Sequence, residues 1–128
     1  MLPLCRDQQI AVIPWSPLAR GRLTRDWDAS SYRLETDEVS KRLYAVMADA
    51  DRAVVERVAE IAALRGIPRA QVALAWVAAQ RGITAPIVGA TKAHHLDDAV
   101  AALSVMLSDE EIRRLEGPYQ PHPVLGFV

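Results

Sequence analysis

The chain has 128 residues, of which 51% are hydrophobic and 24% charged, and its formal net charge is −1 at pH 7. This length suits one ordinary domain, and the composition is that of a folding chain rather than a disordered one. Fifteen basic residues against sixteen acidic ones exclude a general nucleic-acid-binding domain, which carries a net basic charge. No apolar run approaches the roughly 18 residues of a membrane span. We therefore expect neither nucleic acid nor a membrane as a partner.

The cysteine and histidine residues predict no metal site. Cys5 is the only cysteine, so the chain cannot form an internal disulfide or a thiolate metal cluster, and a reducing, cytoplasmic location is expected. His94 and His95 are adjacent, and on a helix their side chains would point about 100 degrees apart, too far to bind one metal ion together. His122 is isolated in the tail.

Two short apolar segments are predicted to be strands. Residues 9–16, QIAVIPWS, are continuously apolar in the middle, as strands buried in a parallel sheet are. Residues 85–91, APIVGAT, form a second strand that ends in a glycine turn. Between them, residues 24–45 are polar and aperiodic, and this pattern predicts a long loop of the kind that is functional or mobile.

Four helices follow the loop. The pattern predicts helices over 51–65, 67–82 and 92–103, and a last one that begins after Ser108. The apolar residues expected to face the core are Val54, Val58, Ile61 and Leu64 or Arg65 in the first helix, and Leu96, Val100 and Leu103 in the third. Residues 117–128, with three prolines, are an aperiodic tail.

Residues at the predicted helix ends are typical of helix caps. Gly66 is a predicted C-cap of the first helix, and Thr91 a predicted N-cap of the third. Ser108 followed by Glu111 three residues later is a capping box.

The alternation of strands and helices predicts an α/β fold with a parallel sheet. Two strands do not make a stable parallel sheet, since such sheets need covered faces and neighbours at both edges. The chain therefore resembles part of a larger fold, and its exposed strand edges predict self-association.

Two loops at the strand ends are candidate anion sites. After the second strand, Gly89 lets backbone approach a ligand, and Lys92 adds a positive charge at a helix N-terminus. After the first strand, Arg20 and Arg22 flank Gly21. Taken alone, the loop at Gly89 is better explained as an ordinary capped turn with an exposed lysine, and the arginines around Gly21 as two solvated surface residues. Both loops, however, follow the carboxyl ends of consecutive parallel strands, where such folds place ligands.

The stretches IPWSPLARGRLTRDW, RAQVALAWVAAQRGITAPIVGATKAHHLDDAVAAL and LSDEEIRRLEGPYQPHPVLGF resemble the C-terminal half of the aldo-keto reductases. They are most similar to the bacterial branch that resembles potassium-channel β-subunits. The resemblance implies a (β/α)8 TIM barrel, incomplete here, with strands 7 and 8 at 9–15 and 85–89, and it makes residues 1–128 a partial reductase domain.

The resemblance also implies an NADP(H) site. Its cofactor-binding residues would be Trp15, Ser16, Pro17, Leu18, Ala19, Arg20, Arg33, Gly89, Thr91, Lys92, His95, Asp98 and Ala99. The family often has Gln or Arg at position 95, Glu at 98 and Asn at 99, so the preference of NADP over NAD is left open.

The function implied is NADP-dependent reduction of aldehydes or ketones. The family's catalytic Asp, Tyr, Lys and His come from earlier strands than those matched here. No residue of this chain is therefore predicted to be catalytic, and we expect the 128 residues alone to be inactive, with a carbonyl substrate bound only by a full-length form. The alternative is a non-catalytic nucleotide-binding or interaction module, or a gene remnant, that needs a partner chain to complete its fold.

Overall fold

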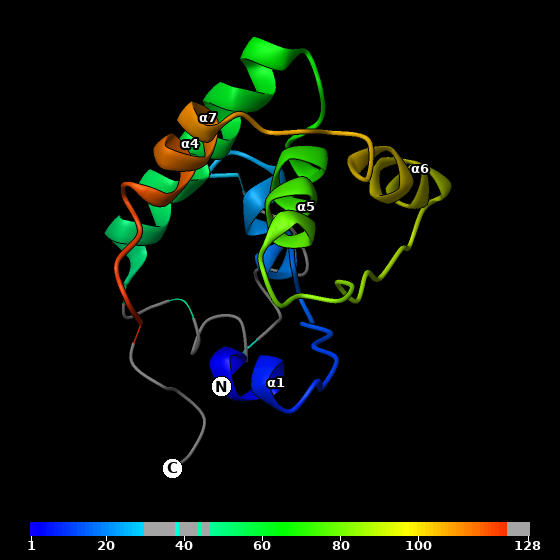
Figure 1. Cartoon of the computed structure of the whole chain (residues 1–128). Coiled ribbons are helices and arrows are strands. Elements are labelled where there is room, and N and C mark those ends of the chain that lie inside the picture. Colours follow the sequence, from blue (N-terminus) through cyan, green and yellow to red (C-terminus); the bar gives the residue numbers. More distant parts are fainter. Residues whose placement is uncertain (30–37, 39–43, 45–46, 123–128) are drawn as a thin grey trace.

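The computed structural model of the chain describes residues 1–29, 38, 44 and 47–122. Its elements in chain order are α1 (Leu2–Asp7), the 3-10 helix η1 (Ala19–Thr24), α4 (Ala48–Arg65), α5 (Arg69–Ala79), α6 (Ala93–Ala102) and α7 (Asp109–Glu116). Helices α4, α5 and α7 lie together, α6 flanks α5, and α1 stands apart at the N-terminus (Figure 1). The four helices predicted after the loop are confirmed, with α4 beginning three residues earlier than expected.

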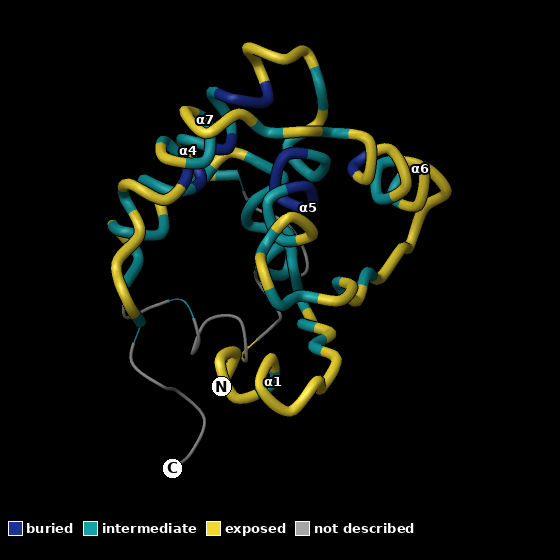
Figure 2. The backbone as a smooth tube through the Cα atoms, in the orientation of Figure 1, coloured by how far each residue is buried: buried dark blue, intermediate teal, exposed yellow. Residues whose placement is uncertain are grey.

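The core lies where α4, α5 and α7 meet. Ile61 of α4 and Val72 of α5 are fully buried, and Leu115 of α7 packs against them. Buried residues are concentrated on these helices, whereas α1 is exposed except at the half-buried Cys5 (Figure 2). Of the inward residues predicted for α4, Val58 and Ile61 are confirmed, but Leu64 is 75% exposed. The prediction for Leu64 is wrong because the buried stripe runs through Val55, Val58, Ile61 and Ala62 and leaves the helix before its last turn.

Two of the three predicted helix caps are confirmed. Gly66 closes α4 with a left-handed φ of 64°, which glycine adopts without steric cost. Ser108 and Glu111 form the expected capping box, in which each side chain bonds the other residue's backbone N–H. Thr91 is not the N-cap of α6. That position is Lys92, whose side chain caps no backbone group.

The predicted strands are present only as two paired segments. No residue in the described ranges is assigned to a strand. The N–H of Thr84 nevertheless donates to the carbonyl of Val12, and that of Ile87 to the carbonyl of Pro14, each at 2.8 Å. Both partners advance along the chain in the same direction, so the pairing is parallel.

Prolines explain why this pairing is not a regular ladder. A parallel ladder would continue through an N–H at position 14 bonding Thr84, and then an N–H at position 86 bonding the Pro14 carbonyl. Both positions are proline, which has no N–H. The Ile87 N–H takes the place of the second bond, and the two segments are held by only part of a ladder.

Helix α6 turns a different face inward from the one predicted. Leu96, Val100 and Leu103 are 59%, 61% and 73% exposed. The helix packs against α5 through Ala102, which is buried, and through a hydrogen bond from Gln71 to Asp98 of 2.9 Å. The prediction of an inward apolar stripe is wrong because no described element covers that side of α6.

Ion pairs join α4 to α7. The Arg65 guanidinium donates from Nε and Nη2 to the two Glu111 oxygens at 2.5 and 2.6 Å, and also from Nη2 to the Met106 carbonyl at 2.8 Å. The hydrogen bond from Arg65 lowers the pKa of Glu111 to about 2. A second pair, between Arg114 and Glu60 at 2.9 Å, lies farther along the same two helices.

Replacing Glu111 with Gln should lower the free energy of unfolding at pH 7 by about 1–2 kcal/mol. Glutamine still completes a capping box, so the change removes mainly the ion pair with Arg65. The matched control is Glu110→Gln, because the Glu110–Arg113 pair is two-thirds exposed and its loss should have little effect. Urea unfolding monitored by circular dichroism measures both.

The same ion pair predicts a pH dependence. The pKa of Glu111 is lower in the folded chain than its usual 4.5, so its stabilising effect is fully present above that value and is lost as the pH falls toward 2. The difference between wild type and Glu111→Gln should therefore shrink below pH 4.5 and disappear only at about pH 1, where Glu111 is protonated in the folded chain as well. A difference that persists there would contradict the assignment of the stabilisation to the charge.

Candidate functional site

The backbone after the first extended segment adopts left-handed conformations at several residues. The φ angle is 50° at Ser16, 47° at Ala19, 56° at Arg20 and 91° at Gly21. Positive φ is rare for residues other than glycine, and it costs on the order of 1–3 kcal/mol. Residues strained in this way are found most often at functional sites. Three of these residues belong to the predicted cofactor site. The sequence indicated special backbone only at Gly21.

Local hydrogen bonds hold this strained segment. The N–H of Ala19 donates to the Ser16 carbonyl at 2.9 Å, and that of Gly21 to the Leu18 carbonyl at 2.8 Å. The Gly21 carbonyl in turn accepts from the Thr24 hydroxyl at 2.8 Å and from Arg25 Nε at 2.9 Å. The shape of the segment is therefore fixed within the chain itself.

The two arginines of this segment lie against aromatic rings. Arg20 lies 5.7 Å from the Trp15 ring centroid, and Arg22 lies 4.9 Å from Trp27 and 5.2 Å from Tyr44. Cations are attracted to the faces of such rings. The alternative of two solvated arginines is wrong for Arg22, which is held between two rings. Trp15 is 63% exposed and presents most of its ring to solvent.

The second loop is open to solvent. Gly89 and Lys92 are exposed, and a Cβ added at Gly89 would have no atom within 4 Å. The Thr91 N–H donates to His95 Nδ1 at 3.4 Å, so His95 closes the first turn of α6. The Asp98 carboxylate accepts the hydrogen bond from Gln71 described above and faces α5.

The parallel pairing brings the two loops to the same end of the molecule. Because residues 12–14 and 84–87 run side by side in one direction, the loops that follow them begin at a common edge. Residues 89–92 lead into the N-terminus of α6, whose free N–H groups favour an anion. Arg33, the remaining arginine of the predicted site, lies outside the described residues, as does most of the loop 24–45.

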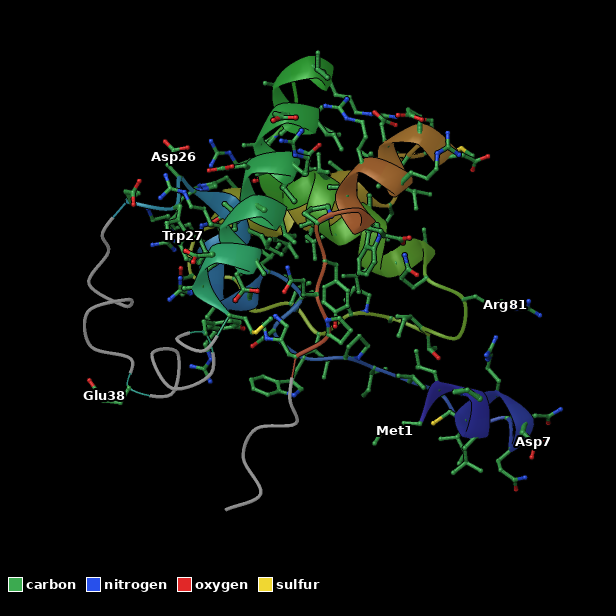
Figure 3. All side chains as sticks on the ribbon, turned by 90° about the vertical axis from the view of Figure 1, so that its left-hand side faces the viewer. Met1, Asp7, Asp26, Trp27, Glu38 and Arg81 are labelled. Carbon is green, nitrogen blue, oxygen red and sulfur yellow. The ribbon has the colours of Figure 1, made fainter. Side chains whose placement is uncertain are left out.

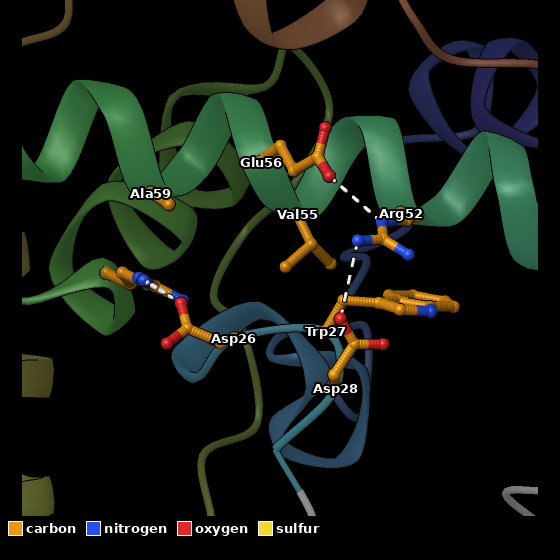
Figure 4. A pocket seen from close by; sticks show the side chains of 8 residues that line it. Asp26, Trp27, Asp28, Arg52, Val55, Glu56 and Ala59 are labelled. Carbon is orange, nitrogen blue, oxygen red and sulfur yellow. Dashed lines mark hydrogen bonds and ion pairs between the residues drawn. The ribbon is translucent and has the colours of Figure 1, made fainter.

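A hollow of about 170 Å³ lies elsewhere, between residues 26–28 and helices α4 and α5 (Figure 4). Arg52 pairs with Asp28 at 3.3 Å and Glu56 at 3.0 Å, and Arg69 pairs with Asp26 at 2.5 Å. The charges of the hollow are satisfied by one another. These ion pairs fasten residues 26–28 to helices α4 and α5, and they leave no unpaired charge for a ligand. The sequence did not indicate this role.

The tail begins with an unexpected contact. His122 Nε2 lies 2.9 Å from Asp51 at the start of α4, and the His122 ring stacks on Tyr119 with 6.2 Å between centroids. His122 was predicted to be an isolated surface residue, and this is wrong. Nothing in the sequence linked it to Asp51.

In the described ranges, no three His, Cys, Asp or Glu side chains come together in a way that could hold a metal ion. Within the same ranges no helix has both the length and the apolar character needed to cross a membrane.

Replacing Gly21 with Ala should lower the free energy of unfolding by about 2 kcal/mol. Alanine would be strained at this φ, and its Cβ would collide with the Arg25 guanidinium. Gly66→Ala is the control, because it has a similar φ but open space, and should cost about 1 kcal/mol. Equal losses in urea unfolding would show that the Arg25 contact does not matter.

Comparison with known proteins identifies the family to which the chain is similar. The profile of the aldo/keto reductase family matches residues 1–119. The chain is 42% identical to a versiconal hemiacetal acetate reductase of Aspergillus parasiticus over 97% of its length, and 41% identical to a putative aryl-alcohol dehydrogenase of Schizosaccharomyces pombe over 100%. It is 38% identical to an aldo-keto reductase of Fusarium vanettenii over 98% of its length.

The chain belongs to the aldo/keto reductase family, a family of oxidoreductases. It spans about a third of these relatives, covering 36%, 36% and 34% of their lengths. The three relatives named are fungal, and the bacterial branch stays a prediction. The family implies a (β/α)8 barrel, which agrees with the parallel direction of the two paired segments.

Proposed function

We propose that this chain is the cofactor-binding third of an NADP(H)-dependent reductase of aldehydes or ketones. The family supports the class of reaction, and the names of two relatives, a reductase and a putative alcohol dehydrogenase, agree with it. The observation that carries the proposal is the parallel pairing of residues 12–14 with 84–87. It supports assigning these segments to strands 7 and 8 of the barrel.

The chain's own residues are suited to holding a dinucleotide. Lys92 and the N-terminus of α6 would bind a phosphate, and the open space at Gly89 would let that phosphate approach the backbone. The exposed ring of Trp15 and the strained residues 16–20 would hold the pyrophosphate and nicotinamide part. When bound, the cofactor would supply the hydride for carbonyl reduction.

The adenosine part would be held from α6. His95, which closes the turn at Thr91, and Lys92 would face the adenosine phosphate. Asp98 uses Oδ1 to accept from Gln71, which leaves Oδ2 for the adenine edge beside Ala99. Asp98 would thus also fix the orientation of α6 on α5.

We propose that these 128 residues alone do not catalyse the reaction. Reduction requires an acid and a bound substrate placed against the nicotinamide, and the residues described here supply only a cofactor cradle. The exposed apolar stripe of α6, formed by Leu96, Val100 and Leu103, favours the related possibility that a further part of the barrel completes the fold.

Titration with NADPH, followed by its fluorescence, tests the cradle. Gly89→Ala should weaken binding by about tenfold, because the new methyl group would occupy the space of the phosphate, while the urea midpoint should not change. Lys92→Met should weaken binding similarly. The control Arg81→Met removes an exposed cation at the opposite end of the same segment (Figure 3) and should leave binding unchanged.

Three results would count against the proposal. The first is a folded chain that shows no binding at millimolar NADPH. The second is equal binding by wild type and Gly89→Ala, which would place the cofactor elsewhere. The third is oxidation of NADPH by the chain in the presence of an aromatic aldehyde, which would refute the predicted inactivity but not the cofactor site.

A further inference from the structure

Arg22 joins the strained loop at residues 16–20 to the part of the chain that follows it. The residue comes directly after Gly21, the last residue of this segment with a positive φ. Its guanidinium lies 4.9 Å from the centroid of the Trp27 ring and 5.2 Å from that of Tyr44. Within the part of the chain that the structure describes, the buried Nε of Arg22 has no hydrogen-bond partner. The two rings therefore hold this side chain where a hydrogen bond at Nε does not.

Ion pairs on either side of Trp27 hold it against the helices. Asp26 pairs with Arg69 of α5 at 2.5 Å, and Asp28 pairs with Arg52 of α4 at 3.3 Å. The Trp27 side chain lines the hollow that these helices form with residues 26–28 (Figure 4). A cation attracted to the Trp27 ring is thus connected to both helices.

The strained loop needs contacts of this kind. Ser16, Ala19 and Arg20 have positive φ angles, which L side chains disfavour. Such a conformation persists only when the surrounding structure over-determines it. Leu23 packs against the core and anchors η1 from below, while Arg22 contacts the two rings directly beside the strained residues. Without the ring contacts of Arg22, the loop would relax more easily toward negative φ.

We propose that Arg22 is a positioning residue for the dinucleotide. Its contacts with Trp27 and Tyr44 keep residues 16–20 in the shape that would hold the pyrophosphate and nicotinamide part. A loop that already has its bound shape loses less conformational entropy when the ligand binds, so its affinity is higher. This role rests on the proposed function, whereas the effect of Arg22 on the loop is a property of the chain without a ligand.

Hydrogen exchange of the unliganded chain, measured by NMR, tests the effect on the loop. Arg22→Met keeps an apolar stem but removes the guanidinium, and the amide of Gly21 should then exchange about three- to tenfold faster. This amide donates to the Leu18 carbonyl at 2.8 Å. The amide of Ile67, which donates to the Ala62 carbonyl at 3.1 Å beyond the end of α4, should exchange at the wild-type rate.

Binding of two ligands tests the effect on the site. Arg22→Met should weaken binding of NADPH, followed by its fluorescence, by about three- to tenfold. It should leave binding of adenosine 2′,5′-bisphosphate, measured by calorimetry, unchanged, because this ligand lacks the nicotinamide half and would be held from α6. A general loss of stability would weaken both ligands alike, so the difference between them identifies positioning.

Three further variants serve as controls. Arg22→Lys keeps a cation near the rings and should recover part of the NADPH affinity. Adding Trp27→Leu to Arg22→Met should weaken NADPH binding by less than Trp27→Leu does alone, because both changes remove the same contact. Arg113→Met removes an arginine from the exposed side of α7, where it pairs with Glu110, and should alter neither exchange nor binding.

Three outcomes would overturn the positioning role and leave the proposed function standing. They are wild-type exchange at Gly21 in Arg22→Met, unchanged binding of NADPH by that variant, and equal weakening of both ligands. Failure of the folded wild type to bind either ligand would refute the proposed function and the positioning role together. Faster exchange at Gly21 combined with a selective loss of NADPH affinity would support the proposal.

Discussion

The arrangement of the site depends on two backbone hydrogen bonds. They run from Thr84 and Ile87 to the carbonyls of Val12 and Pro14, and they join parts of the chain that are distant in sequence. Through them the strained loop at residues 16–20 and the open loop at Gly89 begin from two neighbouring segments. Two prolines remove the bonds that would otherwise reinforce this contact. The loops are thus individually well defined, by Gly21 and by α6, but their mutual placement is weakly held.

The helices, in contrast, are held by a small apolar core and by ion pairs. Ile61, Val72 and Leu115 bring α4, α5 and α7 together, and Arg65 with Glu111 secures the ends of α4 and α7. Trp76 of α5 adds a hydrogen bond to Glu116 of 3.1 Å. The chain therefore combines a packed helical unit with two extended segments joined by two backbone hydrogen bonds. Its exposed large apolar side chains lie on the extended segments and on α6, and also on α1, at the end of α4 and after α6 and α7.

Helices and their caps could be predicted from the sequence because their signals are local. The period of apolar residues located α4, and Gly66 and the Ser108 capping box located two helix ends. The apolar stripe of α6 was wrongly predicted to face the core. The spacing of apolar residues shows which face of a helix is apolar, but it does not show whether another element covers that face. Left-handed Ala19 and Arg20 carry no compositional signal, because L side chains of every kind disfavour that conformation. The contact of His122 with Asp51 depends on the tertiary fold alone.

The position of the core residues in the sequence affects the order in which the chain acquires structure during synthesis. Among the described residues, every buried core residue, from Val55 to Leu115, lies after the long loop. The carbonyls of Val12 and Pro14 are therefore synthesised well before the N–H groups of Thr84 and Ile87 that bond to them. During that interval these two bonds are absent, and an extended apolar segment in this state is a natural client for a chaperone that binds extended apolar peptides.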